Sequence, residues 1–500
     1  MNSPIDASRR EEPERAGDAR RRSRSGSSSR MLRPIEKAVF AHLSILIVLS
    51  SWYFAGGSAF AQLLIMSWGS VGALLTVIAF FTRERKDDDL RRTLHWLWPV
   101  AGFNAFVLVS CVNPSFTEKF FRGESYLAAT GAAYSYLPST ARVATSLQHL
   151  WMFNALYFSA FNLALVVRRR RALRGLLIVT AANAVVLSIF GTLQKLTSNG
   201  LFFGAVPSPN PRFFATFIYG NHWSAFVALV IAATIGLVFH YSRRHDNSPR
   251  IRSLVLNGII GVVLMSITPF ITGSRAGTIM AAVLVIAGGV NAFMRVWRRE
   301  RALGQLATGA LIGLIACGGV AVGGAIWLGN EAMEKRLSDT REQLQAGGVF
   351  QGRAGLYSDT WNLAMDKPVF GWGLGTYSKV FQLVRPRPLE ARRQYERSYA
   401  DAHSDWLQAI AEVGFVGSLL LALTAVLPLR VLHRHHFNNG LTSWALAGCA
   451  LVLLYAMVEF PFANAAVTLT WWICLFCAVQ NARLRDVSVR AAKLEAARQE

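Results

Sequence analysis

One histidine and three arginines are the residues of this sequence best suited to chemistry. His403 follows a long polar segment and precedes the apolar run that begins at Trp406. A neutral imidazole can accept the proton of an attacking hydroxyl group at neutral pH. Arg212, Arg275 and Arg353 each carry a guanidinium group that can bind two phosphate oxygens at once. Together the three arginines would suit a lipid-linked diphosphate as ligand, and His403 is a candidate for acid–base chemistry beside it.

Residues close to His403 in the sequence leave two local structures open. If a helix begins near His403, the side chains of His403, Leu407 and Gly414 share one of its faces. If Ser404 or Asp405 is instead the N-cap, His403 precedes the helix and reaches into the loop. A lone histidine at such a boundary also has a simpler interpretation, as a hydrogen-bonded residue of the membrane interface.

Two further features could support the site. Glu412 lies within an apolar run, and because burying a carboxylate in a membrane is costly it needs a polar partner or a water-lined cavity. The spacing Gly371-x-Gly373-x-Gly375 predicts a tight turn. The alternative is that the backbone amides of this turn bind a phosphate group.

The composition places these residues in a membrane protein. Of 500 residues, 53% are apolar and 16% are charged, whereas about 25% of the residues in an average globular protein are charged. This balance excludes a disordered chain and a disulfide scaffold, and it argues against a soluble enzyme. The formal net charge of +23 would by itself suggest a nucleic-acid-binding protein, so the positions of the charges decide between the two classes.

Twelve apolar stretches have the length of a helix that crosses a bilayer, about 17–25 residues. We therefore predict an all-α polytopic membrane protein with about twelve transmembrane helices. The predicted division is a disordered basic tail (1–37), nine helices (38–329), a loop domain (330–405), three helices (406–480) and a second tail (481–500). The twelve stretches are 38–55, 59–81, 93–112, 149–167, 175–193, 223–241, 253–271, 278–297, 306–329, 406–429, 443–460 and 465–480.

The basic residues gather on one side of these predicted helices. The amino-terminal tail and every second connecting segment after it hold 35 of the 52 Lys and Arg residues and 15 of the 29 Asp and Glu residues, so +20 of the net charge lies there. Short basic loops mark the cytoplasmic side of a membrane protein and match the anionic lipid of the inner leaflet. We therefore predict that both termini are cytoplasmic. A nucleic-acid partner is disfavoured, because the basic runs are short and flank the membrane.

All the candidate residues then fall on the outer side. The loop 330–405 is predicted to contain helices at 331–346 and 354–365, and Arg353 opens the second of them. Arg275 lies in a turn so short that it must stay at membrane level, on the side where short loops otherwise avoid positive charge. Arg212 precedes Asn221 in another outer loop. The alternative for each arginine is a side chain that extends to solvent or to lipid headgroups.

The segment His403-Ser404-x-x-Leu407-x6-Gly414 resembles the signature histidine motif of the O-antigen ligase and polysaccharide polymerase superfamily. In that family the motif stands at the end of a large periplasmic loop between the ninth and tenth spans. The run from Arg353 to Tyr377, with Pro368 and the Gly-x-Gly-x-Gly spacing, is similar to the loop of the family. The resemblance covers roughly residues 180–480, and the first 150 residues contribute only topology.

The resemblance implies a metal-independent, inverting glycosyltransferase of the GT-C type, without a cofactor, in the bacterial inner membrane. Such an enzyme transfers glycan from an undecaprenyl-diphosphate-linked donor to a lipid A–core or polysaccharide acceptor on the periplasmic face, in lipopolysaccharide and other cell-envelope synthesis. His403 matches the histidine that acts on the acceptor hydroxyl. Arg275, Arg212 and Arg353 match the arginines that bind the diphosphate, and Asn221 matches an asparagine before the sixth span. The Asp405-Trp406 pair after His403 departs from the family pattern.

Three other functions remain open at this point. A polymerase of the same superfamily shares the donor and the motif and differs in its acceptor, and a protein O-oligosaccharyltransferase is a further acceptor class. A transporter or flippase would carry polar residues at mid-membrane on paired broken helices. Only Glu412 and Glu459 are acidic within the predicted spans, and the conspicuous polar groups gather on one side, which favours an enzyme.

Overall fold

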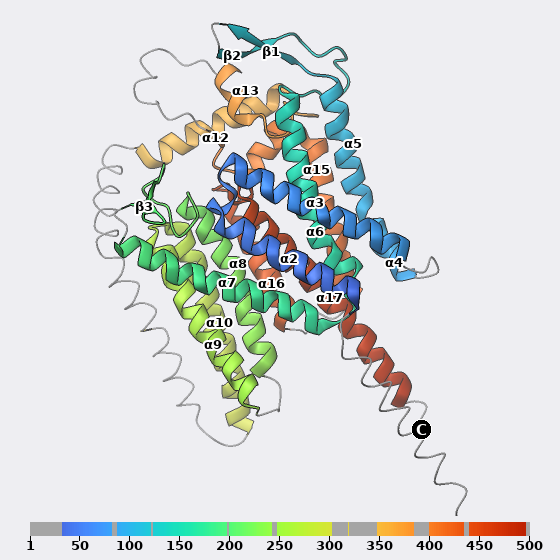
Figure 1. The fold of residues 1–500 in the computed structure, drawn as a ribbon, viewed down its shortest axis with the longest axis vertical. Coiled ribbons are helices and arrows are strands. Elements are labelled where there is room, and N and C mark those ends of the chain that lie inside the picture. Colours follow the sequence, from blue (N-terminus) through green and yellow to red (C-terminus); the bar gives the residue numbers. More distant parts are fainter. Residues whose placement is uncertain are drawn as a thin grey trace, which may run out of the picture.

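The computed structural model describes residues 33–82, 88–121, 124–197, 200–242, 248–302, 319, 348–384, 400–434 and 440–496. Helices dominate these ranges (Figure 1). They are α2 (Pro34–Trp52), α3 (Ala59–Thr82), α4 (Asp88–Leu94), α5 (Trp98–Val112), α6 (Val143–Leu165), α7 (Arg170–Thr197), α8 (Gly220–Ser242), α9 (Pro249–Ile271), α10 (Arg275–Ala302), α12 (Gly348–Asp366), α13 (Tyr377–Val384), α15 (Asp405–Arg434), α16 (Gly440–Tyr455) and α17 (Ala465–Ala496). Two small hairpins pair β1 (Phe116–Phe121) with β2 (Glu124–Ala129) and β3 (Leu201–Phe202) with β4 (Val206–Pro207).

The chain is an all-α polytopic membrane protein, as predicted. Nine helices of the described ranges are long and apolar enough to cross a bilayer. The shorter α16 and the less apolar α6 occupy two more of the twelve predicted stretches. The remaining stretch, 306–329, lies outside the described residues, apart from residue 319, as does the predicted helix at 331–346.

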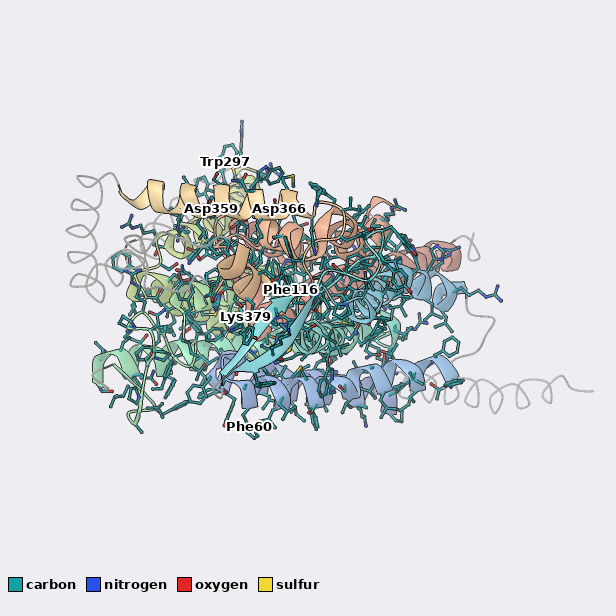
Figure 2. The ribbon with its side chains drawn as sticks, turned by 90° about the horizontal axis from the view of Figure 1, so that it is seen from above. Phe60, Phe116, Trp297, Asp359, Asp366 and Lys379 are labelled. Carbon is teal, nitrogen blue, oxygen red and sulfur yellow. The ribbon has the colours of Figure 1, made fainter. Side chains whose placement is uncertain are left out.

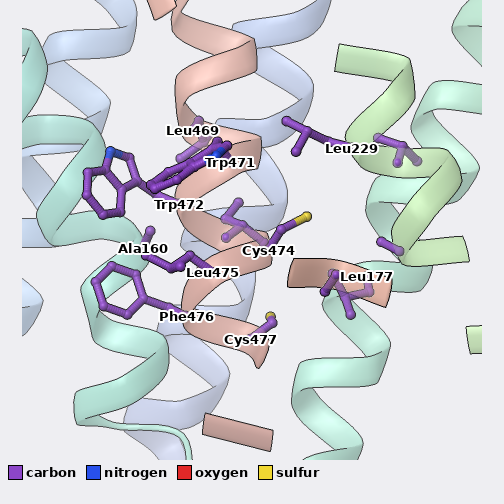
Figure 3. Packing of buried hydrophobic residues seen from close by; sticks show 14 of the residues in the cluster. Ala160, Leu177, Leu229, Leu469, Trp471, Trp472, Cys474, Leu475, Phe476 and Cys477 are labelled. Atoms are coloured by element: carbon purple, nitrogen blue, oxygen red, sulfur yellow. The ribbon is translucent and has the colours of Figure 1, made fainter. Parts of the chain in front are cut away.

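The core of the bundle is built around α8 and α17. Helix α8 and the Ala465–Asp486 part of α17 are apolar and almost wholly buried, whereas most residues of α9 and α10 are not buried inside the bundle. Aromatic rings fill the space around α17: the ring of Trp472 lies 4.9 Å from that of Tyr157 and 5.7 Å from that of Phe476, centroid to centroid (Figure 3). A helix that is hydrophobic all round belongs inside a bundle, so sequence and position agree.

Small residues let α3 and α6 approach closely. A Cβ added to Gly69 would lie 2.7 Å from the Cβ of Ala155, and one added to Gly72 would meet the Ser159 side chain. Polar groups then close the contact, because Asn162 Nδ2 donates a 2.7 Å hydrogen bond to the Gly72 carbonyl. Close backbone approach with polar contacts between helices is the usual packing of helices in lipid.

The elements that carry the candidate residues lie together at one end of the bundle, which we call the loop end. Figure 1 shows β1, β2, α12 and α13 at this end, and α17 ends at the opposite one. Seen from the loop end, α12, with Asp359 and Asp366, and α13, with Lys379, lie over the membrane helices (Figure 2). The hairpin β1–β2 was not predicted, and it reaches the same region because Phe116 packs against Trp372, with ring centroids 6.3 Å apart.

Helix α12 is longer than the helix predicted at 354–365. It begins at Gly348, so Arg353 lies in its second turn and does not open it. The end at Asp366 is as expected, because the following Lys367-Pro368 cannot continue the helix. Leu356 and Leu363 are buried, in agreement with the predicted inward face.

Candidate active site

His403 stands immediately before α15 and does not lie within it. The Ser404 hydroxyl accepts a 3.4 Å hydrogen bond from the backbone N–H of Leu407, which is the contact of an N-cap residue. Of the two predicted local structures, the one in which His403 precedes the helix is therefore correct. The expectation that His403, Leu407 and Gly414 share a helical face was wrong, because the capping residue lies between the histidine and the helix.

The backbone of His403 is held in an unusual conformation. Its φ is +52°, in the left-handed region that side-chain-bearing residues rarely adopt. The carbonyl of His403 accepts a 3.0 Å hydrogen bond from the hydroxyl of Tyr357 on α12, which also donates to Val458 O at 3.3 Å. Strained backbone of this kind persists where the surroundings fix it, and it clusters at functional sites.

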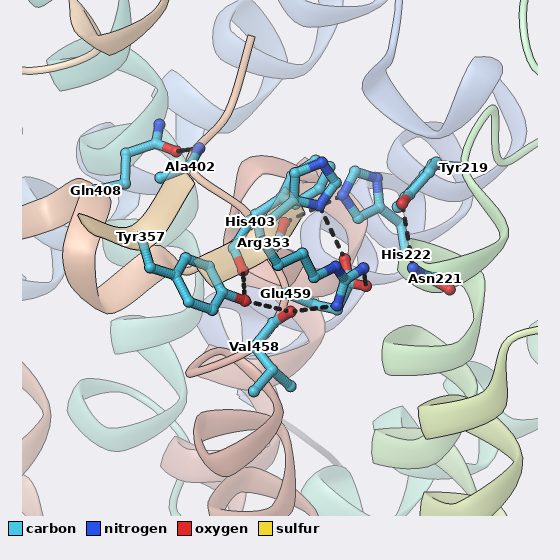
Figure 4. A network of polar contacts seen from close by, with 11 residues as sticks. Tyr219, Asn221, His222, Arg353, Tyr357, Ala402, His403, Gln408, Val458 and Glu459 are labelled. Atoms are coloured by element: carbon cyan, nitrogen blue, oxygen red, sulfur yellow. Dashed lines mark hydrogen bonds and ion pairs between the residues drawn. The ribbon is translucent and has the colours of Figure 1, made fainter. Parts of the chain in front are cut away.

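The imidazole of His403 lies between a carboxylate and an aromatic ring (Figure 4). Its Nδ1 is 3.5 Å from Oε2 of Glu459, and its ring meets the ring of Phe460 edge to face at 4.8 Å. The side chain is 24% exposed while Nδ1 is wholly buried, so the exposed part lies on the other ring atoms. The described residues offer Nε2 no hydrogen-bond partner, and this nitrogen lies on the open side of the ring.

Glu459 joins His403 to Arg353. Its Oε1 accepts a 2.7 Å hydrogen bond from Nη2 of Arg353, whose Nη1 donates to the Val458 carbonyl at 3.3 Å. Burial alone would raise the pKa of the Glu459 carboxyl. The contact with His403 and the charge of Arg353 outweigh burial and hold that pKa below its ordinary value. Glu459 is therefore a buried, ionised carboxylate shared by two of the residues predicted for the site.

The first turn of α8 and the residues before it line the other side of the same segment. His222, at the start of α8, places Nε2 3.1 Å from the Phe460 carbonyl. The ring of Tyr219 stacks on Phe460 at 5.3 Å, and Asn221 donates a 3.2 Å hydrogen bond to the Tyr219 hydroxyl. Asn221 thus supports Tyr219, which stacks on Phe460, and Phe460 in turn packs against His403.

Arg212 and Arg353 both act on Tyr219. Burial and then the nearby carboxylate of Glu459 raise the pKa of Tyr219 to about 12. The positive charges of Arg353 and Arg212 oppose that rise, so both guanidinium groups lie within electrostatic reach of this phenol. The structure therefore joins Arg353 and His403 through Glu459, and it places Arg212 within electrostatic reach of Tyr219.

The loop of Arg212 meets the turn of Arg275 at the start of α8. A Cβ added to Gly220 would lie 2.6 Å from the Arg212 carbonyl oxygen and 3.0 Å from the Cβ of Thr272. Any side chain at Gly220 would push these two segments apart. Because Gly220 has no side chain, the loop of Arg212 and the turn of Arg275 can pack closely together beside His222.

Arg275 is the first residue of α10. The Ser274 hydroxyl caps this helix by accepting a 3.2 Å hydrogen bond from the Gly277 N–H, and Gly277 packs directly against Ser224 of α8. Arg275 therefore lies at the loop end of the bundle, where α10 begins directly after the predicted short turn.

The glycine turn (Gly371 to Gly375) forms a hydrogen-bonded unit around the side chain of Glu412. The Oε2 of Glu412 accepts a 2.6 Å hydrogen bond from the Gly375 N–H, and its Oε1 accepts from Tyr377 N at 3.3 Å and from Gln408 Nε2 at 3.1 Å. The polar partner that burial of Glu412 requires is therefore the turn itself. The N–H of Gly373 donates to the Glu412 carbonyl at 2.7 Å, so the amides of this turn bind the protein and not a phosphate in this structure.

Asp405 fixes the start of α15 to the segment that carries Glu459. Its carboxylate accepts a 2.9 Å hydrogen bond from the N–H of Phe462, and its own N–H donates to the Ala456 carbonyl at 2.9 Å. Because these contacts join the segment before α17 to the residue two positions after His403, Asp405 sets the distance between the histidine and Glu459.

Sequence reasoning missed the residues that hold His403 in place. Glu459 was noted only as one of two acidic residues within the predicted spans, and Tyr357, Phe460 and His222 were not singled out. The one available signal was the cost of an acidic residue in an apolar span, which calls for a partner. That partner is Arg353, 106 residues away, and only the fold reveals the pairing.

Comparison with known proteins relates part of the chain to one family. A search of curated proteins found no match to the chain. Residues 260–422 match the family model described as O-antigen ligase. The matched segment contains Arg275, Arg353 and His403, whereas Arg212 and Glu459 lie outside it. Residues 260–422 of this membrane protein are thus similar to the O-antigen ligase family, in agreement with the resemblance seen in the sequence.

Proposed function

We propose that this protein is a glycosyltransferase that moves glycan from an undecaprenyl-diphosphate-linked donor to a hydroxyl group of a lipid A–core or polysaccharide acceptor. The family supports a ligase- or polymerase-like joining of lipid-linked polysaccharide in a membrane. The observation that carries the proposal is the placement of His403. Its Nδ1 is buried against the Glu459 carboxylate, while the other ring nitrogen lies on the open side of the ring.

In the proposed reaction the open nitrogen of His403 accepts the proton of the acceptor hydroxyl. The hydroxyl oxygen attacks the anomeric carbon of the donor, a carbon–oxygen bond forms, and the bond to the diphosphate breaks. The electron pair of that bond stays on the lipid diphosphate, and a single displacement inverts the anomeric configuration. Positive side chains aimed at the leaving group stabilise the charge that develops on it.

Arg212, Arg275 and Arg353 are the proposed diphosphate ligands, in place of a metal ion. Arg353 uses two of the five guanidinium N–H groups of an arginine in its contacts with Glu459 and Val458, which leaves donors for a phosphate oxygen. Its side chain is 43% exposed, so a ligand can reach it. The exposed Arg212 lies near the same Tyr219.

We place the site on the periplasmic face of the inner membrane, with both termini in the cytoplasm. The distribution of charge supports this orientation, because the short loops on the side opposite the site hold most of the basic residues. Short loops govern orientation, whereas a long loop such as 330–405 crosses the membrane largely regardless of its charge.

A transfer assay with purified protein and a polyprenyl-diphosphate glycan tests the role of the arginines. Arg275→Ala and Arg212→Ala are expected to raise the KM for the donor or lower kcat by about tenfold or more, since each removes charge from the leaving group. Lys379→Ala is the matched control, because Lys379 is an exposed cation on α13 outside the network. The wild-type rate is expected to persist in a metal chelator.

Two further arms of this assay test the acceptor and the face. Supplying lipid A–core, free polysaccharide or an acceptor peptide separates the ligase from the polymerase and from the protein O-oligosaccharyltransferase. In sealed membrane vesicles, transfer to an acceptor that cannot cross the bilayer is expected only when the periplasmic face points outward. Loss of activity in the chelator, or arginine variants that match Lys379→Ala, would contradict the proposed charge stabilisation.

A further inference from the structure

We infer that Glu459 is a positioning residue that fixes the ring orientation and the tautomer of His403. This inference rests on the proposed function, because it assigns a role to Glu459 in the proton transfer by His403. It concerns a residue outside the segment 260–422 that matches the family model. The argument starts from the two oxygens of the Glu459 carboxylate, which have different partners.

One oxygen of Glu459 is bound and the other is available to the histidine. Oε1 accepts the 2.7 Å hydrogen bond from Arg353. Oε2 is buried, has no hydrogen-bond donor within the described part of the chain, and faces Nδ1 of His403 at 3.5 Å. That Nδ1 is likewise buried and has no other acceptor among the described residues. Two buried polar atoms without other partners are costly unless they pair with each other.

The distance of 3.5 Å is one that substrate binding can shorten. Hydrogen bonds of catalytic groups are commonly long in the absence of substrate and tighten in the reacting complex. The Arg353 contact limits the movement of the carboxylate, since it holds Oε1 while Oε2 stays directed at the imidazole.

The pairing determines which nitrogen of His403 acts as the base. A carboxylate accepts hydrogen bonds, so it favours the tautomer with the proton on Nδ1. The lone pair then lies on Nε2, on the open side of the ring. When Nε2 takes the acceptor's proton, the imidazolium that forms lies beside the negative charge of Glu459, which stabilises it. Glu459 itself keeps its charge throughout and does not touch the substrate.

The segment around Glu459 is held from several elements, so its carboxylate is placed with little freedom. The Val458 carbonyl accepts hydrogen bonds from Arg353 and Tyr357 of α12. The N–H of Asp405 donates to the Glu459 carbonyl at 3.2 Å. His222 of α8 contacts the Phe460 carbonyl, and the Phe460 ring packs on the imidazole of His403. A carboxylate fixed in this way is preorganised for its partner.

The test compares Glu459→Gln with wild type in the glycan-transfer assay, with kcat and KM measured across pH. Glu459→Gln keeps the shape and removes the charge, so kcat is expected to fall at least tenfold while the KM for the donor changes less than threefold. The acidic limb of the kcat/KM profile is expected to move to lower pH, because protonation of the imidazole no longer gains from a neighbouring charge. The charged or titratable groups around His403 are Glu459, Asp401, Arg353, Tyr357 and His222.

Three further variants separate positioning from a general loss of structure. Glu118→Gln is the matched control, since that carboxylate pairs with Arg142 at 3.1 Å in a partly exposed contact away from His403. Glu459→Asp retains the charge and is expected to recover part of kcat, with the acidic limb where wild type has it. Arg353→Met removes the other partner of Glu459; it is expected to raise the KM for the donor and to move the acidic limb to higher pH, opposite to Glu459→Gln, because Glu459 then acts on the imidazole alone.

The outcomes also distinguish this inference from the proposed function. If His403 variants abolish transfer but Glu459→Gln, folded as judged by its melting temperature, keeps the wild-type kcat and pH profile, the positioning role is overturned and the proposed function stands. The positioning role is also overturned if Glu459→Gln lowers kcat, Glu459→Asp does not recover it, and the acidic limb of Glu459→Gln stays at the wild-type pH. If His403 variants transfer glycan normally, it is the proposed function that fails.

Discussion

The backbone of His403 is strained, so the geometry of this site costs folding free energy. A left-handed backbone at a side-chain-bearing residue costs on the order of 1–3 kcal/mol, and the hydrogen bond from Tyr357 to the His403 carbonyl helps to hold it. This conformation turns the imidazole toward Glu459 and away from the first turn of α15. Replacing the capping residue or the tyrosine would release the histidine without touching its ring.

Glu412 is the residue whose role the structure changes most. It was grouped with the supporting residues of the site, and the structure makes it the anchor of the glycine turn. Glu412→Gln replaces an acceptor oxygen by an N–H donor that faces other donors, so the free energy of unfolding is expected to fall by about 1–3 kcal/mol. Thermal unfolding of detergent-purified protein measures this loss.

Glu118→Gln is the control for Glu412→Gln, because it makes the same chemical change at a partly exposed ion pair. We expect it to cost no more than about 1 kcal/mol. Equal melting temperatures for the two variants would show that the buried contacts of Glu412 do not anchor the turn.

At the residue scale, the sequence pointed to the groups with distinctive chemistry and not to their partners. His403, Arg353 and Arg212 could be singled out because an imidazole can act as a base and a guanidinium group can bind phosphate oxygens. Glu459 could not, because its role depends on a contact across 106 residues with Arg353. A carboxylate acquires such a role only when the fold brings it to a histidine.

Among the elements, α15 determines how the loop joins the membrane helices. The helix is broken at Gly414, which has φ +62° and ψ −171°. The inserted loop segment satisfies the backbone groups that the break exposes: the N–H of Phe415 donates to the Pro368 carbonyl at 2.8 Å and that of Trp372 to the Ala411 carbonyl at 3.0 Å. Irregular backbone at membrane depth is tolerated only where protein covers it in this way.

The break in α15 makes Gly414 intolerant of a side chain. Any Cβ at this position would meet the backbone of Val369 and Phe370, and its positive φ disfavours every other residue. Gly414→Ala is therefore expected to lower the free energy of unfolding by at least about 1–3 kcal/mol and the melting temperature with it.

Gly355→Ala provides the comparison for Gly414→Ala. A Cβ at Gly355 would meet nothing within 4 Å, and alanine in the interior of α12 should be neutral or stabilising by up to about 1 kcal/mol. If the melting temperature of Gly414→Ala were no lower than that of Gly355→Ala, Val369 and Phe370 could not pack against the backbone of α15 at Gly414 as described.

Helices were predictable from this sequence because apolar runs of membrane length leave the backbone no alternative in lipid. The carboxyl-terminal end of α12 and the start of α15 followed from Pro368 and from the capping residue. The break at Gly414 did not, because only an inserted segment of another part of the chain compensates for it. The hairpin β1–β2 was missed as well, since its six-residue strands lack regular alternation of apolar and polar residues.

On the scale of the whole molecule, we expect the net charge and the proposed site to lie on opposite sides of the membrane. The charge pattern of the sequence assigns +20 of the +23 net charge to the side predicted to be cytoplasmic. At the loop end, the guanidinium group of Arg353 pairs with the buried carboxylate of Glu459, and its charge acts on Tyr219. Such concentration at one membrane face suits a transferase that works on lipid-linked substrates, whereas a carrier needs polar groups at mid-membrane.

The core helices explain why the loop end can be strained without loss of the fold. Helices α8 and α17 are buried almost throughout, and the segments that carry His222 and Glu459 directly adjoin them. Rigid neighbours of this kind hold a catalytic group within the narrow tolerance that proton transfer requires. The burial of these two helices could be anticipated from their uniform apolar character, but their adjacency to the site could not.

The most direct test of the account is glycan transfer by reconstituted protein carrying His403→Asn. Asparagine tolerates the left-handed backbone at this position, so the substitution removes the imidazole with little added strain. With an undecaprenyl-diphosphate glycan as donor, wild type is expected to transfer, and His403→Asn to do so at least about 100-fold more slowly, at an unchanged melting temperature. Transfer by His403→Asn at the wild-type rate would contradict the assignment of His403 as the base.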